Sequence, residues 1–416
     1  MRQTMKHITA VTVLASSLLV PAIGHAADAG PVTRGEFIRL IAERLELSPK
    51  DNTLGLPKDV AADSEFANAV RVMMERKILQ GYEDGTFRLS QPVTDTEASY
   101  ILGRLLGVRD GDAAKALPER FGAAIGGAGN LSAESAQQLV DTALKSDESA
   151  LEWLKKAAEK QKEVVSFRTA AEMDMTMAMK AFSDNPAMTV DMKASSKLEF
   201  HIEQGLHQAM ETEMVGPTGP VKIQMNQYTV TSGTYVEMND PATGKLTWFD
   251  MTKQMPYSFE QLIEMQKNSS LSMENWTLPG FFYRDHGTET VDGVKLRKVE
   301  MNGSLTSFKE IMDIYAKVSG GTNSGMTDTL KAMPGFEDLS LKMSGVVWID
   351  ETSMLIQRMD MDMVMSYGDN SVIPISEVAM SMDMKYADYN GDVEVKLPEA
   401  AKQAVPLPMP TAGAGS

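Results

Sequence analysis

The stretch Met-Asp-Met-Thr-Met-Ala-Met at residues 173–179 places a methionine at every second position. Successive side chains of a β-strand point to opposite faces of the sheet, so this period predicts a half-buried strand with one methionine face. The same alternation returns at residues 359–365 and at residues 380–384. We therefore expect three strands of one sheet that carries methionines on one side.

Outward from these runs, turn signals such as Asp292-Gly293 and Asn390-Gly391 separate further apolar segments, which favours antiparallel pairing. Two amphipathic segments, at 258–267 and 306–318, are expected to be helices. The sequence thus predicts an α+β fold in which about ten strands within residues 164–397 form a large curved antiparallel sheet, a half-barrel, with helices on its concave side. The additional strands are expected at 188–194, 197–203, 208–215, 221–230, 233–239, 245–250, 291–301 and 341–350.

Methionine accounts for 32 of the 416 residues, whereas the chain has only 13 phenylalanines and 4 tryptophans. Its unbranched, polarisable thioether adapts to ligands of irregular shape, which suits the wall of a hydrophobic cavity. Plain core packing is the alternative, because burial of each methionine stabilises the fold by about 1.5–3 kcal/mol with or without a ligand. The candidate cavity residues are Met173, Met175, Met177, Met179, Met359, Met361, Met363, Met365, Met380, Met382 and Met384.

The first third of the chain carries helix signals instead. Thr33 with Glu36, and Thr94 with Glu97, form Thr-x-x-Glu capping boxes in front of apolar-periodic segments, and each box predicts a helix start. A third start is expected after Ser132. We therefore expect a small all-α domain at residues 30–146 and a connecting helix at 147–163.

The order of these parts resembles the S-layer homology repeat. The resemblance rests on the Asp59-Val60 entry, a helix near 69–78, the Gly-Tyr-x-Asp-Gly-x-Phe turn at 81–87 and the capping box at Thr94. It covers residues 31–145 and is strongest in the middle repeat. The family implies non-covalent attachment to the secondary polysaccharide of a Gram-positive cell wall, often a pyruvylated one, and hence a place at the cell wall or cell surface.

The resemblance also implies which residues contact the polymer. The family's wall-contacting arginine corresponds to Arg34, whereas the second repeat has Asp95 at that place. One charge-assisted hydrogen bond contributes about 1.5–3 kcal/mol and micromolar binding needs about 8 kcal/mol, so other contacts have to add to Arg34. Helix capping and turn formation are the competing roles of the neighbouring residues. The candidate polymer-binding residues are Thr33, Arg34, Glu36, Tyr82 and Asp84.

The second unit resembles the half-barrel superfamily of the periplasmic lipoprotein-localisation carrier and the mycobacterial lipid-binding lipoproteins. The resemblance rests on the leading helix into Ser166-Phe167-Arg168, the hairpin at 291–296, the helix after Leu305 and the segment 347–359. It covers about residues 150–397 and implies a hydrophobic or amphiphilic ligand such as a lipid. The lipid-carrying cysteine of such lipoproteins is missing, since the chain contains no cysteine.

Residues 1–26 combine Arg2 and Lys6, an apolar run from Ile8 to Val20, and small residues up to Ala26. This pattern is typical of a secretory signal peptide with cleavage after Ala26, and the run is too short for a membrane-spanning helix. No later segment is long and apolar enough to span a bilayer, so we expect a secreted protein without a transmembrane segment. The end at 398–416 is expected to be a flexible tail.

The net charge of −17 disfavours nucleic acid as a partner, because it repels phosphates. No catalytic motif such as Gly-x-Ser-x-Gly or His-Glu-x-x-His appears, so we expect no enzymatic activity and no cofactor. Thioethers suit Cu(I), so a methionine-rich copper-binding protein is a further alternative, which is disfavoured by the absence of cysteine and by the presence of only His201, His207 and His286 after residue 26. The sequence predicts a cell-wall-associated protein that binds a lipid-like ligand; an adhesive or structural envelope protein with a solid methionine-rich core is the alternative.

Overall fold

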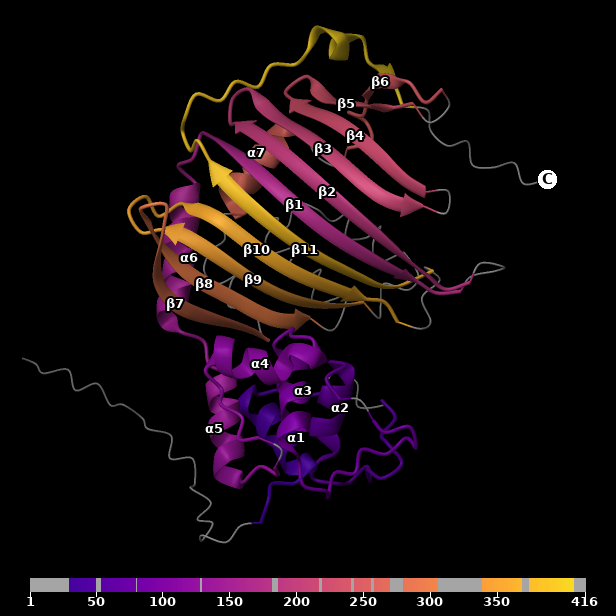
Figure 1. Ribbon diagram of the computed structural model, residues 1–416, viewed down its shortest axis with the longest axis vertical. Helices are drawn as coiled ribbons and strands as arrows, with labels where there is room; N and C mark the ends of the chain where they lie inside the picture. Colours follow the sequence, from indigo (N-terminus) through magenta and orange to yellow (C-terminus); the bar gives the residue numbers. More distant parts are fainter. Residues whose placement is uncertain are drawn as a thin grey trace, which may run out of the picture.

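The computed structural model describes residues 30–49, 54–79, 81–127, 129–181, 186–216, 219–240, 243–255, 258–269, 280–305, 339–368 and 374–407. The predicted signal peptide, the predicted helix at 306–318 and the chain from residue 408 lie outside the described residues. A helical unit is followed along the chain by a large curved sheet (Figure 1).

Three predicted helices of the helical unit begin at the expected cap, whereas the helix predicted near 69–78 is found at 67–75 without a side-chain cap. Thr33 and Thr94 both form complete capping boxes with Glu36 and Glu97, whereas Ser132 caps its helix by accepting a hydrogen bond from the Ser135 amide. One helix, at 110–121, was not predicted, because no side chain caps it and Pro118 lies inside it. The described helices of this unit are α1 (Arg34–Arg44), α2 (Ala67–Glu75), α3 (Asp95–Leu105), α4 (Asp110–Phe121) and α5 (Ala133–Ala143).

The segments that enter the repeats meet at the centre of the helical unit. Isolated β-bridges join Thr33 to Pro92 and Thr94 to Asn130. Around them the apolar faces of the helices form one core, in which Phe37, Leu102 and Leu117 are fully buried. The repeats therefore share a single hydrophobic core.

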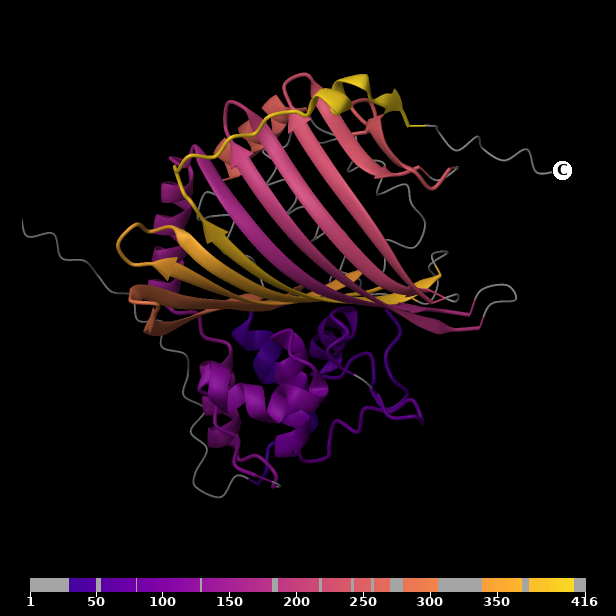
Figure 2. The same ribbon diagram turned by 45° about the horizontal axis from the view of Figure 1, so that its top comes forward.

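The described residues of the second unit form one twelve-stranded sheet in the order β12-β6-β5-β4-β3-β2-β1-β11-β10-β9-β8-β7. The sheet is curved and unclosed (Figures 1 and 2), as predicted, and every pairing except β12 with β6 is antiparallel. Its strands are β1 (Ser166–Met179), β2 (Met188–His201), β3 (Gly205–Gly216), β4 (Gly219–Val230), β5 (Gly233–Asn239), β6 (Leu246–Asp250), β7 (Phe281–Val291), β8 (Val294–Leu305), β9 (Ser340–Asp350), β10 (Ile356–Ser366), β11 (Ile375–Ala387) and β12 (Val405–Pro406).

The twelve strands differ from the eleven segments predicted as strands, three methionine runs and eight others, in three places. The predicted strands at 188–194 and 197–203 are the single strand β2, while β7 and β12 were not predicted as strands. β1 lies at the middle of the sheet, paired with β2 on one side and with β11 on the other. The pairing of β1 with β11 therefore joins the first strand of the unit to one of its last strands.

Helices cover part of each face of the sheet. α6 (Glu148–Gln161) and α7 (Phe259–Ser269) lie behind the sheet in both views (Figures 1 and 2). α6 buries Ala150, Leu154 and Ala157 in one cluster with Tyr283 of β7 and Ile349 of β9. The helical unit lies against the other face, beside β8 and β9.

The contact between the two units is built around Glu300 of β8. Arg120 of α4 donates from Nε to Glu300 Oε1 at 2.6 Å and from Nη2 to Asn302 Oδ1 at 2.7 Å, while His286 Nε2 lies 2.6 Å from Glu300 Oε2. Gly107 lies close to the sheet and has a φ of +74°. A Cβ added there would lie 2.9 Å from the carbonyl oxygens of Gly303 and Met343. Only glycine fits this approach without strain.

The chain after β11 runs across the ends of the strands from β1 to β6 (Figure 2). The Asn390 amide donates to the Ser166 carbonyl, and the Val395 amide donates to Gln204 Oε1. The segment then forms the short helix η1 (Glu399–Gln403) and pairs with β6 as β12. The part of the expected flexible tail at 398–407 thus contains a short helix and a two-residue strand that pairs with β6.

Candidate functional site

The strand register places the three predicted methionine runs side by side. Met173 of β1 pairs with Met382 of β11, which pairs in turn with Met361 of β10. Paired residues share a face of the sheet, and so do residues two apart on one strand. All of the predicted methionines therefore lie on the same face, which we call the methionine face.

Sequence reasoning missed further methionines of this face, because they are spaced too widely to form a run. Together with the predicted set they make up nineteen of the chain's 32 methionines. The additional members are Met188, Met192, Met210, Met214, Met225, Met238, Met301 and Met343.

Six of these residues stand in register on six adjacent strands. We call them the methionine row: in order from β9 to β3 they are Met343, Met363, Met380, Met175, Met192 and Met214. Neighbouring strands lie about 4.8 Å apart, so the row extends for roughly 24 Å across the sheet. Its side chains are half-buried, so each of them keeps part of its surface exposed.

The methionine face ends in an aromatic cluster. The ring of Phe167 lies 5.1 Å from that of Phe200, 6.2 Å from that of Tyr386 and 6.1 Å from that of Tyr389. Burial raises the pKa of both tyrosines, and the Tyr389 hydroxyl donates to the Ile356 carbonyl at 2.6 Å. This end of the face is packed and dry.

The opposite end of the face is exposed. On β2, Phe200 is 6% exposed whereas Met188 is 42% exposed, and Val221 and Ile223 of β4 are exposed to a similar extent. Large apolar side chains that remain open to solvent over several strands mark a surface that another apolar body can cover. The face thus has a closed aromatic end and an open apolar end.

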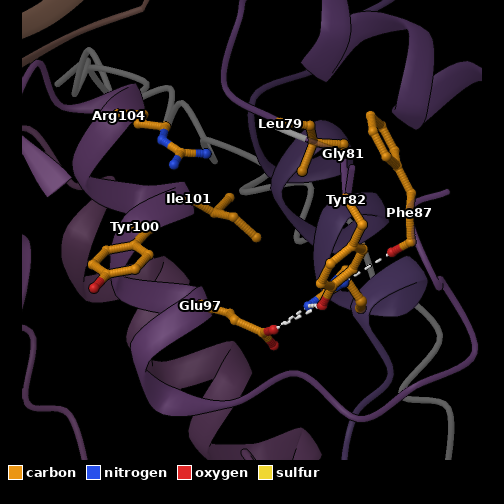
Figure 3. Close-up of a pocket in the computed structure, with 9 residues that line it drawn as sticks. Leu79, Gly81, Tyr82, Phe87, Glu97, Tyr100, Ile101 and Arg104 are labelled. Carbon is orange, nitrogen blue, oxygen red and sulfur yellow. Dashed lines mark hydrogen bonds and ion pairs between the residues drawn. The ribbon is translucent and has the colours of Figure 1, made fainter. Parts of the chain in front are cut away.

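Arg34 and Tyr82, two of the predicted polymer-binding residues, line a pocket of about 210 Å³ in the helical unit (Figure 3). Arg34 is 8% exposed and donates to the Phe87 carbonyl at 2.9 Å, to the Tyr82 hydroxyl and to the Glu97 carboxylate. Glu97, which the sequence indicated only as a helix cap, thus holds the place at which the carboxylate of a ligand would meet Arg34.

The remaining predicted polymer-binding residues stabilise local structure. Glu36 Oε2 accepts from the Thr33 amide at 2.8 Å, which completes the first capping box. Asp84 accepts from the Thr86 hydroxyl at 2.6 Å and from the Thr86 amide at 3.0 Å, and these bonds lower the pKa of Asp84 to about 2. The structure does not bring these three side chains into contact with Arg34.

Asp95 occupies in the second repeat the place that Arg34 occupies in the first. It is 5% exposed, accepts from the Gly129 amide at 3.2 Å and lines a second pocket of about 400 Å³. An acidic side chain repels a carboxylate, so the two pockets differ in the charge that they present.

The described residues offer neither a cluster of metal-ligating side chains nor a membrane-spanning helix. They contain no group of three or more His, Cys, Asp or Glu side chains arranged to hold a metal ion. Within the same residues, none of the helices has the length and apolarity required to cross a membrane.

Three solved structures are remotely similar to the chain. LprF from Mycobacterium bovis is 13% identical with a TM-score of 0.34 and covers 62% of this chain and 99% of its own. LppX from Mycobacterium tuberculosis is 13% identical with a TM-score of 0.28, at 60% and 100% coverage. An outer membrane lipoprotein-sorting protein domain from Vibrio parahaemolyticus is 12% identical with a TM-score of 0.20, at 61% and 98% coverage. No curated protein matches the chain.

Two family descriptions match the sequence itself. Residues 58–94 match the S-layer homology domain, which confirms the expected family for the middle repeat. Residues 149–406, more than half of the chain, match a family of unknown function. The chain therefore belongs to the DUF6612 family and carries an S-layer homology domain in front of its sheet.

Proposed function

We propose that this protein is exported, is held at the cell wall by its helical unit and binds an apolar or amphiphilic ligand, such as a lipid, on the methionine face. The observation that carries the proposal is the array of nineteen methionines, all half-buried except the exposed Met188, on a face with one closed and one open end. The S-layer homology domain indicates an association with the cell surface.

The methionine face favours a ligand with long or multiple apolar chains. Each CH₂ group removed from water contributes about 0.8 kcal/mol, whereas association costs about 4–15 kcal/mol. Burial of a chain of about 16 carbons contributes roughly 13 kcal/mol of binding free energy. A lipid can therefore offset the cost of association, whereas a small apolar molecule cannot. Flexible thioethers adapt to chains of differing shape, which supports a class of lipids rather than one compound.

The same face favours binding without catalysis. A thioether neither donates nor accepts a proton at ordinary pH, and it supplies no base or activated nucleophile. The acids of β1, β10 and β11 alternate with the methionines and therefore lie on the opposite face. At the middle of the methionine face a ligand would meet mainly sulfur and carbon, and on β2 and β3 it would also meet the side chains of Ser196, Gln208 and Thr212.

Lipid capture followed by mass spectrometry tests the proposal. The purified chain is incubated with a lipid extract, separated from free lipid and analysed for bound molecules. Met175→Asn places a polar side chain in the methionine row, and Thr176→Asn places the same residue on the opposite face of the same strand. We expect bound lipid in the wild type and in Thr176→Asn, and a loss of about tenfold or more in Met175→Asn.

Two outcomes would contradict ligand binding. If the wild-type chain returns no lipid above the level of an unrelated protein, the methionine face is a packing surface and the structural or adhesive alternative holds. If both Asn variants retain lipid equally, the ligand binds elsewhere.

For wall attachment, we propose that Arg34 and Tyr82 form the polymer-binding pocket and that a carboxylate of the polymer, such as a pyruvyl group, replaces Glu97 as the partner of Arg34. The pocket geometry supports this exchange, because Glu97 already pairs with Arg34 through a carboxylate. Thr33, Glu36 and Asp84 would act indirectly, by holding the helix start and the turn that carry the two contact residues.

A further inference from the structure

We propose that the centre of the methionine face also binds Cu(I), and its chemical analogue Ag(I), through thioether sulfur. The site consists of three consecutive members of the methionine row, Met175, Met363 and Met380, with Met173, Met361 and Met382 beside them. This inference stands on the register of the strands and does not depend on lipid binding.

The register gives the sulfur atoms the required proximity. Met175 of β1 is paired directly with Met380 of β11, and Met380 directly with Met363 of β10. Directly opposed residues have Cβ atoms about 4.5–5.5 Å apart, and residues two apart on a strand are separated by about 6.6 Å. Methionine has three rotatable bonds, so three sulfur atoms from this group can turn toward one ion.

The chemistry of the face selects a soft monovalent ion. Thioethers bind Cu(I), whereas Mg²⁺, Ca²⁺ and Mn²⁺ require carboxylate, carbonyl or water oxygens. The acids next to these methionines in the sequence, Asp174, Asp360 and Asp362, belong to the other face of the sheet. These three carboxylates are therefore not available to an ion held among the methionines.

The choice of residue points to a need for sulfur. Val, Ile and the aromatic residues are the usual occupants of half-buried strand positions, and they would give an apolar face without methionine. Yet the paired positions at the middle of three adjacent strands hold methionine in two successive rows. The side chains are half-buried, so an ion in solution can reach them.

Replacement by leucine separates sulfur chemistry from apolarity, because leucine keeps the volume and the apolar surface. The test variant combines Met175→Leu, Met363→Leu and Met380→Leu. The control variant combines Met188→Leu, Met238→Leu and Met301→Leu, which removes as many sulfur atoms from the margins of the same face. Both are compared with the wild-type chain after circular dichroism has verified the fold.

Cu(I) binding is measured without oxygen, in competition with a chromogenic Cu(I) chelator, and repeated with Ag(I). We expect the wild type and the control variant to bind alike and the test variant to bind about tenfold more weakly or worse. X-ray absorption at the copper edge should show a first shell of sulfur only. Zn²⁺, offered in the same way, should not bind to the methionine face.

Equal loss in the two triple variants, or no competition by the wild type, would overturn the site. Should the triple test variant fail to fold, Met380→Leu alone serves, since Met380 is the middle of the three. Lipid capture is also measured on the leucine variants, so that the metal site is tested separately from the proposed function. A test variant that still binds lipid but no longer binds Cu(I) supports the metal site. A test variant that still binds Cu(I) refutes the metal site, whether or not it binds lipid.

Discussion

Glu97 performs several tasks with one carboxylate. Its Oε2 accepts from the Thr94 amide at 3.1 Å and caps α3, while its Oε1 is an ion-pair partner of Arg34 and lies 3.2 Å from the Tyr82 hydroxyl. Arg34, which we propose as a contact of the polymer, is thus ion-paired within the protein. On this proposal an anionic ligand would compete with Glu97 for Arg34, and the charge of Glu97 would lower the affinity of the pocket.

Glu97→Gln should therefore strengthen polymer binding. Glutamine still completes a capping box, so the helix start is retained while the competing charge is removed. We expect a several-fold gain in the fraction of protein that sediments with purified wall sacculi. The matched control is Glu36→Gln, which changes the capping glutamate of α1. If Glu97→Gln sediments no better than the control, the pocket does not bind the polymer anion.

Arg34→Ala should destabilise the helical unit by roughly 2–4 kcal/mol. The substitution leaves the Phe87 carbonyl and the Glu97 carboxylate without their buried partner. Urea denaturation measures the loss. Arg39→Ala breaks an exposed ion pair with Glu65 and should cost at most about 1 kcal/mol. Similar losses in both variants would show that the Arg34 pair is no stronger than a surface pair.

At the scale of single elements, the helices and strands that local sequence signals determine were predicted well. The capping boxes located α1 and α3, and the period of two located β1, β10 and β11. α4 escaped prediction because tertiary packing of Ala113, Ala116 and Leu117 stabilises it without a cap. β7 escaped because its buried residues Phe281, Phe282 and Tyr283 follow one another without alternation, covered on one face by α6 and on the other by the helical unit.

Thr94→Ala should lower the stability of the helical unit by about 1 kcal/mol, because it removes one half of the α3 capping box. Thr96→Ala is the control: its exposed side chain lies two residues further along the same helix, and its effect should stay within about 0.5 kcal/mol. Urea midpoints of both variants give the comparison. A cap that contributed nothing would leave the two midpoints equal.

At the scale of the whole molecule, the sheet separates two tasks. Its polar face receives the helical unit through Arg120 and Gly107, and its methionine face is turned away from that unit. The composition of the methionine face could be predicted from spacing. Its extent over further strands and the in-register row could not, because pairing between β1 and β11 joins segments about 200 residues apart and no local pattern encodes that register.

The junction between the two units should weaken in acid. Burial alone would raise the pKa of Glu300, but the hydrogen bond from His286 and the charge of Arg120 lower it overall. A folded-state pKa below the unfolded value of about 4.3 means that the carboxylate stabilises the fold above that pH and that this contribution is lost as the pH falls below it. We expect the free energy of unfolding to decline from about pH 5 to pH 3.

Glu300→Gln should remove that part of the pH dependence while lowering stability at neutral pH, since the half-buried Arg120 loses its ion pair with the buried carboxylate. Urea denaturation at a series of pH values measures both effects. Glu203→Gln, an exposed substitution, is the control and should leave the acid slope as it is. An unchanged slope in Glu300→Gln would mean that other carboxylates govern the acid response.

The segment from β11 to β12 spans the strand ends between the middle of the sheet and its far edge. It is hydrogen-bonded to Ser166 and Gln204 near the middle and pairs with β6 at the edge. A segment of fixed length that is attached at both ends restrains any flattening or closing of the sheet between them. We therefore expect the segment from β11 to β12 to limit the width of any ligand that the methionine face can admit.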